Sequence, residues 1–323
     1  MKFPRRHFLR LAAGAAALPA FAQAARADAY PARPVRIVVG FPAGTSSDIT
    51  ARLIGQSLSE RLGQQFLVEN RPGAGTNIAA EEVVHAPPDG YSLLWVTQTN
   101  AINATLYDNL NFNFSHDIAP VAGVIRVPAA MLITSSLPAK TVPEFIAYAK
   151  ANPGKINMCS PGIGSANHVF GALFEMMTGV ELVHVPYKGS WFADLISGQV
   201  QVTFNPLPAS LGLIKGGKVR ALAVTSAMRQ TVLPDLPAVA EFVPGYEATA
   251  WFGIGAPKAT PGEIIAALNR AINSGLADPK IKGRLADLGG EEFSGSAGDF
   301  EKFIATETGK WAKVIKFAGI KSD

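Results

Sequence analysis

The sequence predicts an α/β protein made of two similar lobes, each with a mostly parallel, doubly wound sheet. Short apolar runs rich in β-branched residues alternate with stretches at helical spacing, the pattern of strand–loop–helix units. This alternation restarts near residue 129. In addition, the roughly 296 residues that follow residue 27 are long for one domain and comfortable for two.

The first half of the chain shows the unit three times. A β-branched run predicts a strand at residues 35–39, closed by a Gly-Phe-Pro turn. Apolar residues at helical spacing then predict a helix over 47–62, which ends at Gly63. The remaining predicted elements are a strand at 66–69, a helix over 77–86 and a strand at 91–97.

The second half repeats this pattern. Five further short strands are predicted, at residues 129–134, 156–159, 182–186, 200–204 and 219–225. Helices are predicted at 141–151, 166–178 and 191–197. A turn-rich stretch follows, and beyond it come a strand at 250–254 and helices at 261–276 and 298–317. Two similar α/β lobes are the simplest interpretation.

The first 27 residues have the three regions of an export signal. Basic residues are followed by an apolar run at 11–21, and both 22–24 and 25–27 fit the A-x-A cleavage pattern. Spanning a bilayer takes about 20 apolar residues, so we expect cleavage near residues 24–27, no stable membrane insertion, and a periplasmic mature protein. Adjacent Arg5 and Arg6 favour a twin-arginine signal. A general secretory signal with two neighbouring arginines is the alternative.

Removing the signal changes the charge of the protein. The whole chain has 29 Lys+Arg and 25 Asp+Glu, but the signal holds five of the basic residues and none of the acidic ones. The mature chain is therefore nearly neutral. It lacks the basic block expected of a protein that binds nucleic acid or anionic membrane. Cys159 is the single cysteine, and no Cys/His cluster has metal-ligand spacing. We expect no metal and no cofactor.

Four loops that follow predicted strands are rich in glycine and small hydroxyl residues. In parallel sheets such loops lead into helix N-termini, where ligands bind. Free N–H groups and the helix dipole favour an anion there, most simply a carboxylate. Ordinary strand–helix turns with Ser or Asp caps are the alternative. The loops span residues 41–48, 70–77, 160–168 and 186–190.

These loops also carry a resemblance. The chain resembles the substrate-binding proteins of tripartite tricarboxylate transporters, the Bug family, over essentially the whole mature sequence. Each motif alone is weak, but the ordered set is specific. The matching stretches are Y-P-A-R-P-V-R at 30–36, the loop at 41–48, V-E-N-R-P-G-A-G at 68–75, P-D-G-Y at 88–91, G-I-G-S-A-N-H at 162–168, H-V-P-Y-K-G at 184–189, G-Q-V at 198–200, R-A-L-A-V-T at 220–225 and W-F-G at 251–253.

The resemblance implies a two-lobed periplasmic binding protein, type II-like, that holds a ligand between its lobes. It implies a monomer that captures a small carboxylate and delivers it to integral membrane transporter subunits. Alternatives are an exported, hydrolase-like enzyme and a receptor that only senses its ligand. Lobe 1 would comprise residues 28–125 plus 246–323, and lobe 2 residues 126–245.

The family pattern also implies the ligand-binding residues. Phe41 would form an apolar wall, and the other positions would contact or surround the carboxylate. Asp48 could equally be a helix cap, and a local hydrogen-bonding role is favoured for His168 over proton transfer. From lobe 1 these residues are Phe41, Ala43, Gly44, Asp48, Gly75, Thr76, Thr97 and Asn100; from lobe 2 they are Gly164, Ser165, His168, Tyr187 and Asn205.

Two departures from the family pattern affect the site. Thr45 stands where the family often has glycine, which adds a side chain near the expected anion site. The stretch after Lys188 is about two residues shorter than usual and contains Trp191 and Phe192, so contacts at 190–193 are not carried over. Those aromatic residues either favour a bulky ligand or pack in the core.

The sequence favours a receptor over an enzyme. A nucleophile needs a base within hydrogen-bond reach. The segment G-I-G-S-A at 162–166 does not fit G-x-S-x-G, and Cys159 followed by His168 matches no nucleophile–base signature. We therefore expect no catalytic residues. The ligand stays open among di- and tricarboxylates, acidic amino acids and aromatic acids.

Overall fold

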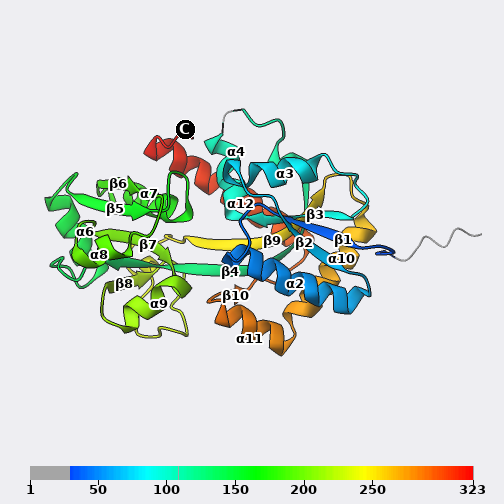
Figure 1. Ribbon diagram of the computed structural model, residues 1–323. Helices are drawn as coiled ribbons and strands as arrows, with labels where there is room; N and C mark the ends of the chain where they lie inside the picture. Colours follow the sequence, from blue (N-terminus) through cyan, green and yellow to red (C-terminus); the bar gives the residue numbers. More distant parts are fainter. Residues whose placement is uncertain (1–29, 108, 323) are drawn as a thin grey trace, which may run out of the picture.

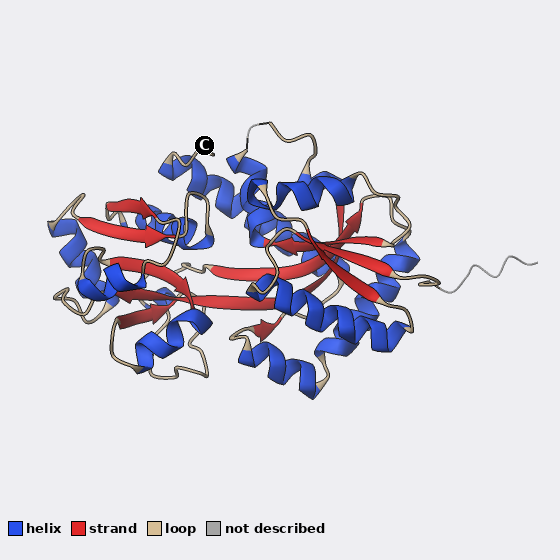
Figure 2. Ribbon diagram, viewed as in Figure 1, coloured by secondary structure: helices blue, strands red, loops and turns tan. Residues whose placement is uncertain are grey.

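The computed structural model describes residues 30–107 and 109–322, so the predicted signal at 1–27 lies outside the described residues. Two groups of strands and helices lie side by side, and two long strands connect them (Figure 1). Helices cover the sheet on both faces (Figure 2). The predicted two-lobed α/β fold is confirmed. Among the described residues, no helix is long and apolar enough to cross a membrane.

Lobe 1 is built on three parallel strands, β1 (Val35–Val39), β2 (Phe66–Asn70) and β3 (Ser92–Thr97), with β1 in the middle. Helix α2 (Ser46–Leu62) packs on one face, where its Ile54 and Leu58 join the buried strand residues. The helix begins at Thr45, whose hydroxyl accepts from the Asp48 N–H, and ends at Gly63. The other helices here are α3 (Asn77–Val84), α4 (Gln98–Leu106), α5 (Phe114–Asp117), α10 (Gly262–Leu276) and α11 (Pro279–Asp287), with the short turn η1 (Ala74–Thr76).

Strands β4 (Ile118–Ile133) and β9 (Thr249–Pro257) connect the lobes. They run antiparallel, and β4 changes partner at Pro128, from β9 to β7 (Val202–Pro206) and β8 (Arg220–Val224). The sheet is therefore mixed rather than mostly parallel. The predicted strand at 129–134 is only the second half of β4. Its first half contains Pro120 and Gly123, which indicate a loop in the sequence but lie at register shifts in the strand.

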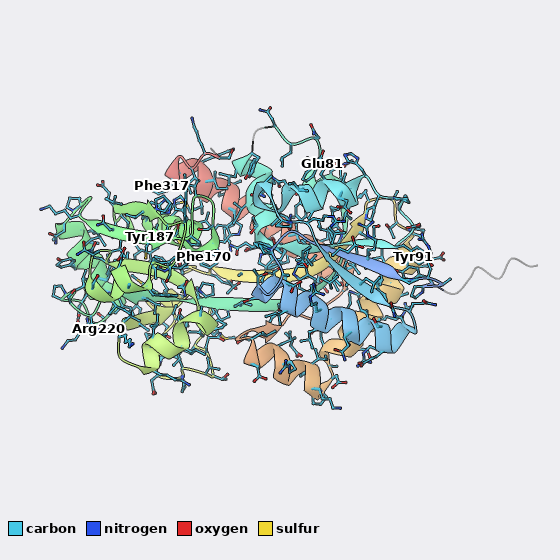
Figure 3. The ribbon with its side chains drawn as sticks, viewed as in Figure 1. Glu81, Tyr91, Phe170, Tyr187, Arg220 and Phe317 are labelled. Carbon is cyan, nitrogen blue, oxygen red and sulfur yellow. The ribbon has the colours of Figure 1, made fainter. Side chains whose placement is uncertain are left out.

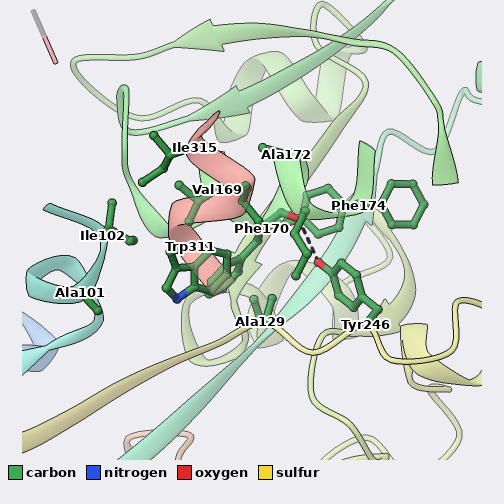
Figure 4. Packing of buried hydrophobic residues seen from close by; sticks show 14 of the residues in the cluster. Ala101, Ile102, Ala129, Val169, Phe170, Ala172, Phe174, Tyr246, Trp311 and Ile315 are labelled. Atoms are coloured by element: carbon green, nitrogen blue, oxygen red, sulfur yellow. Dashed lines mark hydrogen bonds between the residues drawn. The ribbon is translucent and has the colours of Figure 1, made fainter. Parts of the chain in front are cut away.

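Lobe 2 repeats the parallel arrangement with β5 (Ile156–Ser160) between β6 (Leu182–Pro186) and β7. Its helix α7 (Ala166–Thr178) has the predicted bounds and buries Phe170 and Phe174. Tyr246 packs on Phe174, and its hydroxyl donates to the Phe170 carbonyl (Figure 4). The remaining helices are α6 (Val142–Ala151), α8 (Phe192–Ser197), α9 (Leu207–Lys215) and the turn η2 (Val239–Glu241).

The last helix, α12 (Ala297–Ala318), packs on α4 of lobe 1 and on α7 of lobe 2. Its Trp311 stacks on Phe170 with ring centroids 5.6 Å apart (Figure 4). Glu307 is buried and accepts from two indole N–H groups, those of Trp251 on β9 and Trp311. A buried carboxylate held by two donors fixes α12 to the strand that connects the lobes.

Helices α4, α5, α9 and α11, and the two-residue strand β10 (Glu291–Glu292), were not among the predicted elements. Helix α4 is the informative case. Its sequence, Q-T-N-A-I-N-A-T-L, is rich in Asn and Thr, which disfavour helix interiors. In the fold, Asn100 and Asn103 are buried and hydrogen-bonded to neighbouring segments. Tertiary contacts thus stabilise a helix that its own composition does not indicate.

Candidate functional site

A cleft of about 360 Å³ lies where the lobes meet. Both lobes and the connecting strand β9 line it. Lobe 1 supplies loop residues and residues from both ends of α4, and lobe 2 supplies the loop that leads into α7. The lining residues are Phe41, Gly75, Thr97, Gln98, Thr99, Asn103, Leu106 and Tyr107; Pro161, Gly162, Ile163, Gly164, Ser165, Ala166 and Asn167; and Ala250 and Phe252.

The start of α4 forms one wall of the cleft. Thr97, at the end of β3, donates its N–H to Asn100 Oδ1 (2.8 Å), and Asn100 Nδ2 donates to Thr76 Oγ1 (3.1 Å). These bonds fix the strand end, the helix start and the 73–77 turn relative to one another. Gln98 and Thr99 are the first two helical residues, whose N–H groups have no carbonyl one turn earlier in the helix.

The start of α7 forms the opposite wall. Ser165 is its N-cap: the hydroxyl accepts from the His168 N–H and donates to the Gly162 carbonyl at 2.7 Å. Gly164 has a left-handed φ of 72° and donates its N–H to His168 Nδ1 at 3.2 Å. Ala166 and Asn167, the first helical residues, line the cleft. Two helix N-termini from opposite lobes therefore share one cleft.

The electrostatics of the cleft come from dipoles. Among the described residues that line it, none carries a positive or negative side chain. Each helix N-terminus stabilises a nearby anion by about 0.3–1 kcal/mol, and by up to about 2 kcal/mol when partly buried. Such a site accepts one desolvated negative charge without a cationic side chain.

Apolar side chains form the remainder of the cleft. Phe41 and Phe252 lie on the lobe 1 side, and Phe252 packs on the buried Trp95 with centroids 6.0 Å apart. Leu106 of α4 reaches Gly164 of lobe 2 so closely that a Cβ at 164 would lie 2.5 Å from Leu106 Cδ2. The lobes thus approach each other closely at this point, and apolar side chains line part of the cleft.

Two histidines support the lobe 2 wall. The rings of His168 and His184 stack in parallel with centroids 3.5 Å apart, and His184 Nε2 lies 2.6 Å from Ser160 Oγ. Burial, together with the neighbouring His184, lowers the pKa of His168 to about 3. Burial also lowers the pKa of His184. Both rings are therefore neutral near pH 7, and His168 acts as a hydrogen-bond acceptor for the loop.

The predicted site residues fall into three groups. Phe41, Gly75, Thr97, Gly164 and Ser165 line the cleft. Four others are buried and hydrogen-bonded but are not among the lining residues: Thr76, Asn100, His168 and Asn205. The Oδ1 of Asn205 accepts a hydrogen bond from Asn167 Nδ2. Ala43, Gly44, Asp48 and Tyr187 do not line the cleft.

Asp48 is engaged within its own loop. Its carboxylate accepts from the Gly44 N–H, from Asn70 Nδ2 and from the Arg52 guanidinium, all within 3.1 Å. Burial opposes ionisation, but these hydrogen bonds outweigh it and hold the pKa of Asp48 below its ordinary value. Ala43 and Gly44 are exposed. Whether these three residues contact a ligand stays a prediction.

Tyr187 lies in lobe 2 (Figure 3), where it lines a neighbouring recess of about 400 Å³ with Lys188. Its hydroxyl donates to Asp194 at 2.7 Å. Leu106, Tyr107 and the 161–163 loop line both the recess and the cleft. Neither Trp191 nor Phe192 lines the cleft; Trp191 packs against the lobe 2 core instead.

The sequence prediction missed Gln98, Thr99 and Asn103, which line the cleft from α4. Asn103 Nδ2 donates to Asn77 Oδ1 (2.9 Å) and to the Gly75 carbonyl. Because Thr97 and Asn100 follow the third strand at N-cap spacing, they could have indicated a helix start here.

We looked among the described residues for an activated nucleophile and for a cluster of metal ligands. Burial raises the pKa of the Cys159 thiol to about 12, and its sulfur lies in the lobe 2 core. Within residues 30–107 and 109–322, no three His, Cys, Asp or Glu side chains gather as a metal ion would require.

Comparison with known proteins agrees with the geometry. The family described as "Tripartite tricarboxylate transporter family receptor" matches residues 50–320. BugT of Bordetella pertussis is 35% identical over 300 residues, covering 91% of this chain and 92% of BugT.

Three solved structures are similar over almost their whole length. Rpa4515 of R. palustris with adipate has a TM-score of 0.78 at 40% identity, covering 90% of this chain and 99% of that one. The periplasmic binding protein BugD has a TM-score of 0.74 at 35% identity, covering 91% and 100%. MatC of Rhodopseudomonas palustris with bound malate has a TM-score of 0.74 at 30% identity, covering 88% and 100%.

These relatives are solute receptors rather than enzymes. They confirm the predicted resemblance and the predicted fold. The chain therefore belongs to the tripartite tricarboxylate transporter receptor family, whose members include the Bug proteins.

Proposed function

We propose that this protein is an extracytoplasmic receptor that binds one small organic carboxylate in the cleft and delivers it to integral membrane transporter subunits. The observation that carries the proposal is the shared position of two helix N-termini. The starts of α4 and α7, from opposite lobes, line the same cleft, and no charged side chain lines it within the described part of the chain. A carboxylate is the anion that such paired N–H groups hold most simply.

The relatives support this ligand class. The structures of Rpa4515 and MatC carry adipate and malate, both of which are carboxylates. The family description names a receptor of a tripartite tricarboxylate transporter, which supports delivery of the ligand to membrane subunits.

The export signal supports the location. Residues 1–27 carry the basic start, the apolar run and the cleavage patterns of an exported precursor. We expect a twin-arginine route and a periplasmic mature protein. Mass spectrometry of the protein recovered from the periplasm should give an N-terminus near residue 25–28, whereas an intact Met1 would contradict export with cleavage.

Ligand binding should close the cleft between the two lobes. We take lobe 1 as residues 28–125 plus 246–323 and lobe 2 as residues 126–245. Each lobe supplies one of the two N-termini, so a carboxylate bound to both draws them together. X-ray scattering should show a smaller radius of gyration with ligand than without. Equal dimensions at saturation would contradict closure.

A thermal-shift screen tests the ligand class. Mono-, di- and tricarboxylates, acidic amino acids and aromatic acids are compared with their neutral amides. Because a ligand that binds only the folded state raises the unfolding temperature, at least one carboxylate should do so, and its fully amidated analogue should not. A ligand recovered chemically unchanged after dialysis fits a receptor. Failure of every carboxylate would contradict the proposal.

A further inference from the structure

Gln98 differs from every other polar side chain of the cleft. It is the first residue of α4, it lines the cleft and it is only 3% exposed. Within the described part of the chain, neither its Oε1 nor its Nε2 has a hydrogen-bond partner. Asn100 and Asn103 of the same helix both have partners. The lack of partners is therefore specific to Gln98 and is not shared by the other two amide side chains of α4.

A buried carboxamide with two unpaired atoms destabilises the ligand-free protein. Satisfying it requires a hydrogen-bond acceptor for Nε2 and a donor for Oε1 at the same place. The lobe 1 groups nearest in sequence do not supply them, because the amide of Asn100 bonds Thr97 and Thr76. No described group pairs with either atom, and Gln98 lines the cleft, so a ligand group that enters the cleft is the partner that we consider.

The chemistry of that partner is restricted. Carboxylate oxygens only accept, so a second carboxylate would pair with Nε2 and leave Oε1 opposite a negative charge. The cleft also lacks a cationic side chain, among the residues described, to balance a second charge. A hydroxyl or a primary carboxamide accepts and donates together, so either group matches both atoms of Gln98.

We propose that Gln98 recognises a neutral second polar group of the ligand, so that the cleft prefers hydroxy- or carboxamide-bearing carboxylates over analogues that lack this group. The helix N-termini hold the carboxylate, and Phe41 and Phe252 contact the carbon atoms between the two polar groups. This inference rests on the proposed function, because it assumes that a carboxylate occupies the cleft.

Calorimetry with matched ligand pairs provides the test. The pairs are lactate and propionate, malate and succinate, and 4-hydroxybutyrate and butyrate, which vary the distance between carboxylate and hydroxyl. We expect the hydroxylated member of at least one pair to bind about tenfold more tightly, the effect of roughly one buried hydrogen bond. In Gln98→Met, which keeps the length of the side chain and removes both polar atoms, that ratio should fall to about one.

Gln56→Met is the matched control, since Gln56 is exposed on α2 and does not line the cleft. It should keep the wild-type ratio. If Gln98→Met also keeps this ratio, or if no hydroxyl improves binding to the wild type, the inference is overturned.

Thermal unfolding separates recognition from a structural role. Because Gln98→Met removes two unpaired buried polar atoms, its ligand-free unfolding temperature should rise above that of the wild type. A lower temperature would show that the amide stabilises the fold and would overturn the inference.

The failure of this inference is distinguishable from the failure of the proposed function. If no carboxylate binds the wild-type protein, both the proposed function and the inference about Gln98 are contradicted. If carboxylates bind but the hydroxyl and Gln98 make no difference, the receptor function stands and only the role of Gln98 is lost.

Discussion

The starts of α2 and α4 belong to the same lobe and follow parallel strands of the same sheet, yet they differ in how their polar groups are used. At α2, Thr45 caps the helix and the Asp48 carboxylate accepts hydrogen bonds from Gly44, Arg52 and Asn70. At α4, the amide of Gln98 has no described partner and lines the cleft. The polar groups at the start of α2 pair within their own loop and with neighbouring side chains, whereas a buried amide at the start of α4 is unpaired among the described residues. A glycine-rich loop before a helix therefore does not by itself identify a binding site.

The largest expected effect is at α2. Asp48→Ala removes the acceptor that three donors share, so it should lower the free energy of unfolding by about 3 kcal/mol, in the range for hydrogen bonds to a charged group. Denaturant titration measures this, with the exposed Asp287→Ala as the control. If Asp48 acts only within its loop, ligand affinity stays near the wild-type value. A large loss of affinity would place Asp48 in the site, as the sequence predicts.

The start of α7 adds a pH dependence that comes from a buried histidine. The folded-state pKa of His168 is about 3, below its ordinary value of 6.5, so the unfolded chain binds the proton more readily. Stability from this residue is present above pH 6.5 and is lost as pH falls toward 3. Between pH 7 and pH 5 the loss should be about 2 kcal/mol.

His168→Gln tests this dependence, because glutamine still offers an acceptor to the Gly164 N–H and does not titrate. Urea titrations at pH 7 and pH 5 should show a smaller difference for the variant than for the wild type. His184, whose pKa is also lowered, gives the variant a residual dependence of the same sign. An identical pH profile in both proteins would contradict the assignment.

Gly164→Ala, compared with Gly154→Ala, should distinguish the effect of backbone strain on stability from the effect of a contact across the cleft on ligand affinity. The left-handed φ costs a non-glycine residue roughly 1–2 kcal/mol, and the new Cβ meets Leu106 across the cleft. We expect about tenfold weaker ligand binding by calorimetry, a loss near 1.4 kcal/mol. Gly154→Ala is the control, because its φ is 66° and its added Cβ meets open space. It should lose stability but not affinity. Equal affinity in the two variants would mean that contact with Leu106 is unimportant.

The smallest effect concerns the cap of α7. Ser165→Ala should destabilise the protein by about 1 kcal/mol, the usual cost of losing an N-cap. Thr141→Ala removes the cap of α6, away from the cleft, and should cost a similar amount. Only Ser165→Ala should also weaken carboxylate binding in calorimetry. If the two variants bind alike, Ser165 serves the helix alone.

Local sequence patterns indicated much of the fold. Helix α7 lies at its predicted bounds because a serine cap and a final glycine enclose an apolar periodic segment. Strand β1 is similarly evident from its β-branched run. The first half of β4 was not predicted, because Pro120 and Gly123 disfavour a strand until a partner strand accommodates the register shifts around them.

The sequence by itself determined the alternating α/β elements, the near-neutral charge of residues 28–323 and the family to which the chain belongs. Those properties follow from periodicity, composition and ordered motifs, which are local. Tertiary structure alone decided that β4 and β9 run antiparallel between the lobes. It also decided that α4 and α7 start at one cleft. Among the described residues, Gln98 has no side-chain partner there, while Asp48 has three. Partners of this kind come from segments distant in the chain, so no local pattern reveals them.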